Sequence, residues 1–195
     1  RHTVQIVEIL ADPPAGDAGD ANGDGVRDSR EDEFVELLNT GSARVSLAGW
    51  ILGDDDTDQA HWFRFPEGAF VDPGARVVVF GGGSPAGIPG QVWVDDGTIG
   101  NGLTNGGDCV LLVDPVHGVT VDEVVFGDSA GRDQSIVREG EEWKLHTEVA
   151  EGVPFSPGVE TPVYGGSAGH EDTAGADSVG TDVPPAEAQI GRAHV

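Results

Sequence analysis

The chain has 195 residues, of which 37% are hydrophobic, and its 35 acidic and 10 basic side chains give a formal net charge of −25. Such a charge repels the phosphate backbone and attracts divalent cations, so we expect no nucleic-acid partner. The 31 glycines and 12 prolines argue against a helical protein. No apolar run is long enough to span a bilayer, so we expect no direct membrane insertion of this fragment.

Short runs of β-branched and aromatic residues, separated by Gly, Pro, Asn and Asp, predict an all-β chain. Many short strands with turn signals between them are typical of a sandwich or a barrel. In chain order, the predicted strands are Val4–Leu10, Glu33–Asn39, Val45–Leu52, His61–Phe65, Arg76–Phe80, Gln91–Val94, Asp108–Val113, Thr120–Phe126, Gln134–Arg138 and Glu142–His146.

Alternation along these strands predicts which side chains face the core. In His61–Phe65, for example, Phe63 and Phe65 share one face, and Trp62 shares the other with an arginine. The side chains that we predict in the core are Phe34, Leu37, Trp50, Phe65, Val78, Phe80, Leu111 and Val124.

The connection between the first two predicted strands is unusually long for a compact domain. Within it, residues 20–31 read DANGDGVRDSRE and fit the calcium-loop pattern D-x-[DN]-x-[DN]-G-x5-E at every specified position. A bound calcium ion would explain the length, because it offsets loop entropy and carboxylate repulsion. The predicted ligands are the side chains of Asp20, Asn22, Asp24, Asp28 and Glu31 and the backbone carbonyl of Val26.

The loop has a geometric reason for each position but lacks the helices of an EF-hand. Short oxygen side chains can wrap a hard cation, Gly25 permits the sharp turn, and Glu31 can close the sphere with both carboxylate oxygens. Asp32 or Glu33 could replace Glu31 if the next strand begins one residue later. Upstream, the segment DPPAG breaks helices. The alternative is an Asp/Gly-rich turn that binds no metal.

No motif supports catalysis. The segment Gly127–Gly131 reads GDSAG and matches the nucleophile-elbow pattern, but it leads into a predicted strand and not into the helix that an elbow requires. The six histidines show no ligand spacing, so no zinc site is predicted. We therefore expect no enzyme. Trp62 and Trp93 could face outward as a stacking platform for a ligand such as a carbohydrate, with partial burial under loops as the alternative.

The chain divides into two parts by composition. Residues 1–164 carry the strands, whereas residues 165–195 are small, polar and acidic and cannot bury a core. We predict a sandwich domain followed by a disordered acidic linker. The chain begins at Arg1, and its last residues, Ile190–Val195, read like a translated sequencing adapter, so we interpret it as a fragment with an artefactual end.

A succession of short motifs over residues 3–160 resembles the lamin tail domain, specifically its bacterial form, with an EF-hand-like calcium loop inserted after the first strand. No single motif is decisive, but their order and spacing are specific. The motifs are VEIL at 7–10, DEFVELLN at 32–39, LAGWIL at 47–52, FPEG at 65–68, DPG at 72–74, NGGD at 105–108, DQSIVR at 133–138 and SPG at 156–158.

The resemblance implies an immunoglobulin-like β-sandwich with no shared catalytic residues. It implies a module of a secreted or cell-surface bacterial multidomain protein, in which calcium would stabilise an interaction or spacer role. The expected location is extracellular or at the cell surface, and the expected partner is a protein or glycan there. The alternative is a carbohydrate-binding or accessory module of a secreted hydrolase or nuclease. The long insertion and the acidity depart from the animal lamin pattern.

Overall fold

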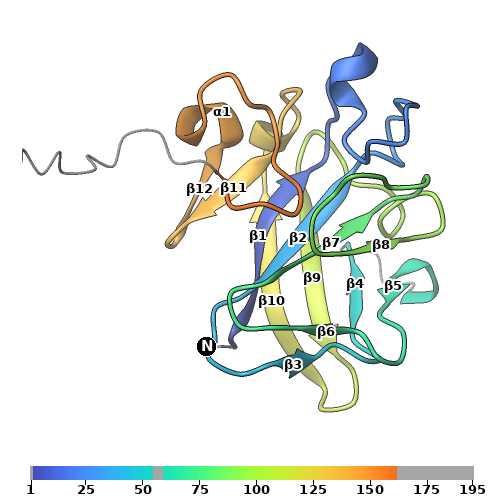
Figure 1. The fold of residues 1–195 in the computed structure, drawn as a ribbon, viewed down its shortest axis with the longest axis vertical. Helices are drawn as coiled ribbons and strands as arrows, with labels where there is room; N and C mark the ends of the chain where they lie inside the picture. The colour runs from blue at the N-terminus through green and yellow to red at the C-terminus, as the bar shows by residue number, and fades with distance from the viewer. Residues whose placement is uncertain (1, 55–58, 162–195) are drawn as a thin grey trace, which may run out of the picture. The chain divides into compact units, whose positions relative to one another are not determined.

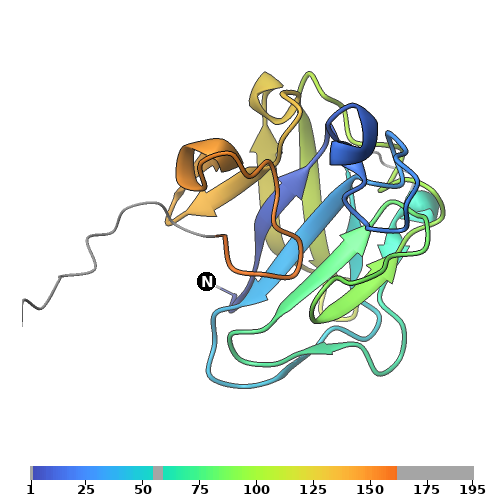
Figure 2. The ribbon, with the colours of Figure 1, turned by 45° about the horizontal axis from the view of Figure 1, so that its top comes forward.

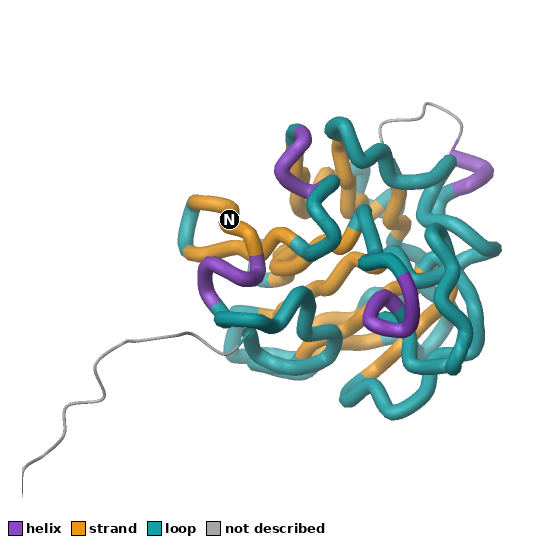
Figure 3. Tube along the Cα trace, turned by 90° about the horizontal axis from the view of Figure 1, so that it is seen from above, coloured by secondary structure: helices purple, strands orange, loops and turns teal. Residues whose placement is uncertain are grey.

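The structure is a computed structural model that describes residues 2–54 and 59–161. The acidic linker predicted for residues 165–195 lies outside this part of the chain. Strands dominate the described residues, and the helices are confined to short turns (Figure 1, Figure 3). These helices are η1 (Gly16–Gly19), η2 (Gln59–His61), η3 (Asp128–Ala130) and α1 (His146–Val149). Among the described residues, no helix has the length and apolar character needed to cross a membrane.

Two sheets and a small β-ribbon form the fold. The six-stranded sheet has the order β12-β11-β1-β2-β7-β8, the four-stranded sheet has the order β10-β9-β4-β5, and β3 pairs with β6. All pairs are antiparallel except β7 with β8. The strands are β1 (Val4–Leu10), β2 (Phe34–Asn39), β3 (Val45–Ser46), β4 (Ile51–Gly53), β5 (Phe63–Arg64), β6 (Phe70–Val71), β7 (Arg76–Phe80), β8 (Gln91–Val94), β9 (Asp108–Asp114), β10 (Val119–Phe126), β11 (Ile136–Glu139) and β12 (Glu142–Leu145).

The expected immunoglobulin-like β-sandwich is confirmed. Every predicted strand has an observed counterpart, but Val45–Leu52 is divided into β3 and β4. The division occurs because a turn intervenes, in which the Trp50 N–H donates to the Leu47 carbonyl at 2.9 Å. The strand β6 was not predicted. The segment His61–Phe65 is mostly turn, and only Phe63–Arg64 pairs as β5.

The main core lies between the two sheets, and most of the predicted core residues are buried. Two are not. Trp50 is partly buried at the margin of the core, and Leu111 is partly exposed. Both neighbours of Leu111, Val110 and Leu112, have 0% exposure, so the predicted phase of β9 is wrong by one residue. In a strand of consecutive apolar residues, alternation alone does not tell the two faces apart.

A β-bulge in β1 changes which face its later residues occupy. The register with β2 shifts between Ile6 and Glu8, where Val7 is the additional residue. Strict alternation from Ile6 would direct Glu8 into the core between the sheets. The bulge instead places Glu8 opposite Glu36 on the outer face of the six-stranded sheet and returns Ile9 to the core.

A second apolar cluster covers part of that outer face. Phe34 and Phe80 pack there at a ring distance of 5.4 Å, and Phe155 meets Phe34 edge-on at 6.4 Å. Phe155 belongs to residues 146–161, which we call the C-terminal strap. Its orange trace begins at α1 and runs back over the six-stranded sheet (Figure 2).

The phase of β9 can be tested with a matched pair of substitutions. We expect Leu112→Ala to destabilise the protein by about 2–5 kcal/mol, because it opens a cavity in a fully buried position. Leu111→Ala should cost less than half as much, because its side chain is already partly exposed. Urea unfolding followed by tryptophan fluorescence measures both values. A larger loss for Leu111→Ala would contradict the observed register.

Candidate functional site

Hydrogen bonds from its own backbone hold the first half of the predicted calcium loop. Asp20 accepts at Oδ1 from the Asp24 N–H at 3.1 Å and at Oδ2 from the Gly25 N–H at 2.8 Å. The Asn22 Oδ1 also accepts from the Asp24 N–H, at 3.0 Å. Gly25 has a φ of 90°, which favours glycine, so the predicted sharp turn is present. Two oxygen side chains, those of Asp20 and Asn22, therefore lie close to the backbone of Asp24 and Gly25.

The glycine-rich segment after β7 supports this half of the loop from the side (Figure 1). The Ala86 N–H donates to the Asn22 carbonyl at 2.9 Å, and the Ser84 N–H donates to Asp24 Oδ2 at 3.0 Å. A Cβ at Gly83 would lie 2.4 Å from Asn22 Nδ2. A glycine at position 83 therefore allows this segment to approach the loop closely.

In the second half of the loop, Asp32 connects the two ends. Its Oδ1 accepts from the Asn22 N–H at 3.0 Å and its Oδ2 from the Asp28 N–H at 2.7 Å. Burial raises the pKa of Asp32, and these two bonds oppose that effect. Glu31 lies instead against Gly82, where a Cβ would be 3.0 Å from Glu31 Cγ. The sequence left Glu31, Asp32 and Glu33 as alternatives for the carboxylate that would close the predicted calcium site. The geometry favours Asp32, because it contacts both halves of the loop.

The remaining predicted ligands lie at the rim. Asp28 accepts at Oδ1 from the Arg30 N–H at 2.8 Å and the Glu31 N–H at 3.1 Å, and these bonds lower its pKa. The side chain of Val26 is exposed, and its N–H donates to Asp24 Oδ1 at 2.9 Å. Val26 is exposed and Asp28 is partly exposed.

The donor set suits calcium in its chemistry, because it consists of oxygens from carboxylates, one amide and one carbonyl. A carboxylate oxygen that accepts one N–H retains a second acceptor site. Among residues 2–54 and 59–161, however, no three His, Cys, Asp or Glu side chains are grouped so as to hold a metal ion. Ion binding would therefore require several loop carboxylates to turn toward a common centre, and calcium stays a prediction.

The two tryptophans predicted as a stacking platform are largely packed. Trp62 is only 8% exposed, and its ring lies against Gly53, where a Cβ would be 2.3 Å from a ring carbon. Trp93 is partly buried against the main core. Each indole Nε1 is buried without a hydrogen-bond partner in the described part of the chain. Of the two alternatives that the sequence left open for Trp62, the structure shows burial, because the indole fills the space above Gly53.

Sequence reasoning missed a buried polar cluster on the outer face of the six-stranded sheet. Glu8 and Glu36 are register partners on β1 and β2, with exposures of 1% and 0%. Ser135, just before β11, donates its hydroxyl to Glu8 Oε1 at 2.7 Å. Ser156, in the strap, donates its backbone N–H to the same oxygen at 2.8 Å. Residues that lie 127 and 148 positions away in the sequence therefore meet at one carboxylate.

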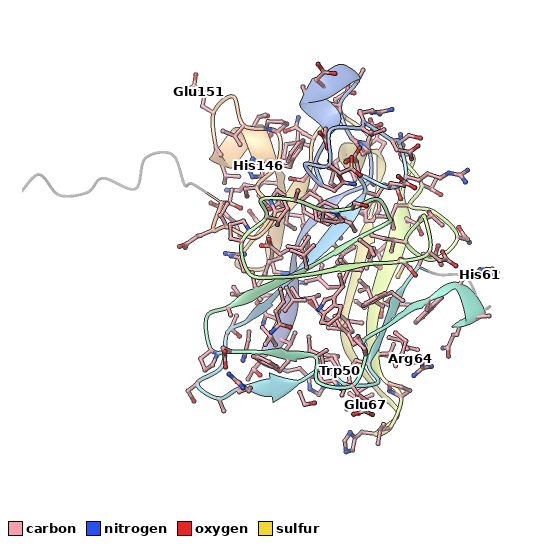
Figure 4. The ribbon with its side chains drawn as sticks, turned by 45° about the vertical axis from the view of Figure 1, so that its right-hand side comes forward. Trp50, His61, Arg64, Glu67, His146 and Glu151 are labelled. Atoms are coloured by element: carbon pink, nitrogen blue, oxygen red, sulfur yellow. The ribbon has the colours of Figure 1, made fainter. Side chains whose placement is uncertain are left out.

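The strap also brings a histidine to this cluster. His146 is completely buried (labelled in Figure 4), with Nδ1 2.7 Å from the Val153 carbonyl and Nε2 2.9 Å from Ser156 Oγ. Ser156 Oγ in turn lies 3.0 Å from Glu8 Oε2. These are the residue types of a Ser-His-acid triad, but the acid contacts the serine and not Nδ1. Ser156 is also only 6% exposed, so this arrangement is structural.

Glu36 completes the cluster through two N–H donors. Arg76 NH1 lies 2.5 Å from its Oε1, and the Gly158 N–H lies 2.6 Å from its Oε2. Burial and the neighbouring Glu8 raise the pKa of Glu36 to about 7, while Arg76 opposes the shift. Burial raises the pKa of Glu33, which lies between the loop and β2, to about 8, and its Oε2 accepts from the Leu103 N–H at 3.3 Å.

One signal in the sequence pointed to the buried cluster without explaining it. Three of the short motifs that carry the family resemblance, VEIL, DQSIVR and SPG, supply Glu8, Ser135, Ser156 and Gly158. Their spacing along the chain gave no indication of contact. The structure shows that these motifs meet through side-chain hydrogen bonds across the sheet.

Comparison with known families gives one match. Residues 1–128 match the family model described as Lamin Tail Domain. This span contains β1 to β10 and the predicted calcium loop, and it ends before β11 and the strap. No curated protein matches the chain.

The raised pKa values predict how stability depends on pH. A buried carboxyl with a raised pKa binds more protons in the folded than in the unfolded state, so stability is greatest below the unfolded pKa and is lost as pH rises through the folded one. For Glu36 and Glu33, this window runs from about pH 4.5 to 8. One pKa unit corresponds to about 1.4 kcal/mol. We expect the melting temperature, measured by calorimetry with a chelator present, to fall by several degrees from pH 5 to pH 8. A rise over this range would contradict the raised pKa values of Glu36 and Glu33.

Proposed function

We propose, because this chain belongs to the lamin tail domain family, that it serves as a non-catalytic interaction or spacer module. The family consists of non-catalytic immunoglobulin-like domains. The proposal rests on the burial of Ser156 and His146. Because these residues are buried, a substrate cannot reach the triad-like set described above. Its hydrogen bonds instead join the strap to β1.

We also propose that calcium stabilises the module. Two features of the loop support this. Its oxygen side chains lie at the spacing of a calcium loop, and Asp20, Asn22 and Asp32 already bring its turn and its two ends together. A bound ion would add a direct link among carboxylates that otherwise repel each other. The Ca²⁺ would be held by Asp20, Asn22, Asp24 and Asp28, the Val26 carbonyl, and Asp32 or Glu31.

The proposed setting is a secreted or cell-surface bacterial multidomain protein, with a protein or glycan at the cell surface as the partner. The acidic composition supports this setting, because carboxylates are calcium ligands and calcium is plentiful outside cells. Extracellular modules bind calcium with dissociation constants of about 0.1–1 mM. A site of that affinity suffices to stabilise a module in such an environment. The high negative charge also disfavours adhesion to nucleic acid.

Calcium stabilisation can be tested through the melting temperature. At about 1 mM calcium and a dissociation constant near 0.1 mM, mass action contributes about 1.4 kcal/mol. For a domain of this size, this corresponds to an increase of roughly 3–6 °C. We expect Asp24→Ala to abolish the increase, because Asp24 lies at the centre of the loop and contacts both Val26 and Ser84. Calorimetric titration measures binding independently.

The matched control is Asp17→Ala, which removes an exposed carboxylate from the nearby η1 without touching the loop ligands. It should retain the full calcium-dependent increase. Asp24→Ala also removes the acceptor of two backbone N–H groups. The comparison therefore uses, for each variant, the difference between the melting temperature with calcium and the melting temperature with a chelator. A wild-type melting temperature that does not respond to millimolar calcium, with no heat of binding, would remove calcium from the proposal.

The absence of catalysis can be tested with Ser156, the serine that contacts His146. We expect no turnover of activated esters, phosphodiesters or DNA by the purified domain, because Ser156 is buried and already hydrogen-bonded to Glu8. Ser156→Ala serves as the matched variant, and background rates should be equal for the two proteins. Hydrolysis that disappears in Ser156→Ala would show that the site opens and would overturn the non-catalytic assignment.

A further inference from the structure

We propose that the predicted calcium loop and the C-terminal strap are energetically coupled, so that an ion in the loop holds the strap closed and a closed strap strengthens ion binding. The inference rests on the proposed calcium site and adds regulation to it, because calcium would control a segment far from the ligands in the sequence. Residues 81–90, which we call the β7–β8 connection, carry the coupling. This green connection runs between the blue loop and the orange strap (Figure 1).

At one end, the β7–β8 connection contacts two residues that are predicted to bind calcium. The Ser84 N–H donates to Asp24 Oδ2 at 3.0 Å, and the Ala86 N–H donates to the Asn22 carbonyl at 2.9 Å. Pro85 lies between these two donors, and its ring fixes one of the backbone dihedral angles. A segment from another part of the chain therefore helps to hold Asn22 and Asp24 in place.

At its other end, the connection meets the strap at Gly158. A Cβ at Gly158 would lie 2.4 Å from the Pro89 carbonyl oxygen and 3.0 Å from Ile88 Cγ2, so a side chain there would force the two backbones apart. Only Gly87 and Ile88 separate Pro89 from Ala86, which bonds to the loop. A displacement of the strap therefore reaches the loop through few backbone torsions.

An apolar contact provides a second, independent connection. Ala21, the second residue of the predicted calcium loop, is 3% exposed and belongs to the apolar cluster of Phe34 and Phe80. Phe155 of the strap and Ile88 of the β7–β8 connection pack against the same cluster. The loop, the connection and the strap therefore share one apolar layer on the outer face of the six-stranded sheet, and opening the strap would expose part of it to water.

The direction of the coupling follows from what an ion requires of its ligands. Carboxylates that repel each other bind an ion more tightly when the fold already holds them in place. An oxygen that accepts one N–H from the connection keeps a second acceptor site for an ion. The connection therefore favours ion binding, and disturbing the strap should weaken it. Because coupling between two sites is reciprocal, calcium should also stabilise the closed strap.

The decisive variant is Gly158→Ala, which places a methyl group against Pro89. Gly152→Ala is the matched control. Both glycines lie in the strap and have a positive φ, 81° at Gly158 and 75° at Gly152, but a Cβ at Gly152 would meet nothing within 4 Å. The two changes therefore introduce comparable backbone strain, and they differ in whether they displace the β7–β8 connection.

The measurement is calorimetric titration of each protein with CaCl2, at one pH and well below the melting temperature. We expect Gly158→Ala to bind calcium at least about fivefold more weakly than the wild type, which is the lower end of typical coupling between sites. Gly152→Ala should bind with the affinity of the wild type. Equal affinities of the two variants would overturn the coupling while leaving the calcium site in place. No binding by the wild type would remove the calcium site and the coupling together.

Hydrogen exchange of the strap amides tests the reciprocal effect. In the wild type, calcium should increase the protection of these amides severalfold relative to a chelator, and in Asp24→Ala it should not. Amides of β9, in the other sheet, serve as the reference, because their exchange reports unfolding of the domain as a whole. An increase that is equal in the strap and in β9 would show that calcium does not act on the strap, and would overturn the proposal.

Phe155→Ala keeps the proposal testable if Gly158→Ala does not fold. It removes the ring of the strap from the shared apolar cluster. Val159→Ala is its control, because this strap residue is 44% exposed. Calcium binding, measured in the same way, should be weaker in Phe155→Ala and unchanged in Val159→Ala. Equal calcium affinities of these two proteins would again overturn the coupling.

Discussion

Glu8 and Glu36 are buried opposite each other, and groups from several parts of the fold stabilise their carboxylates. Removing two like charges from water is costly unless both receive hydrogen bonds and a counter-charge. Glu36 receives hydrogen bonds and a counter-charge from Arg76 on β7 and a further hydrogen bond from the strap, whereas Glu8 receives hydrogen bonds from Ser135 before β11 and from the strap. The chain must therefore return across its own first strand after β12. The same path places the partly buried Phe155 on the outer face.

Local patterns were sufficient to predict most strands, because short β-branched runs bounded by turn residues specify them within a few residues. They did not predict which side chains face the core where a strand departs from strict alternation or consists of consecutive apolar residues. The bulge at Val7 rotates Glu8 out of the core, and nothing in VQIVEIL marks the extra residue. In β9, DCVLLVD could place either Leu111 or Leu112 inside, and packing against the opposite sheet decides for Leu112.

The two candidate sites differ in how far apart their members lie in the sequence. The predicted calcium loop is local, so its turn at Gly25 and the hydrogen bonds that Asp20 accepts could be anticipated from twelve consecutive residues. The position of Asp32 required the structure, because it depends on where β2 begins. The buried cluster joins Glu8 to Ser156 across 148 residues, and no spacing rule connects such positions. Only the topology, with β1 beside β11, brings them together.

The attachment of the strap also determines how the domain would carry mechanical tension. A pull applied to the chain after Thr161 reaches Gly158 and Ser156 before it reaches β12. These two residues are anchored to β2 and β1, the two central strands of the six-stranded sheet. The force therefore enters the middle of the sheet and is shared by many backbone hydrogen bonds. Without the anchor, the same force would peel β12 and β11 away from the edge, one pair of residues at a time.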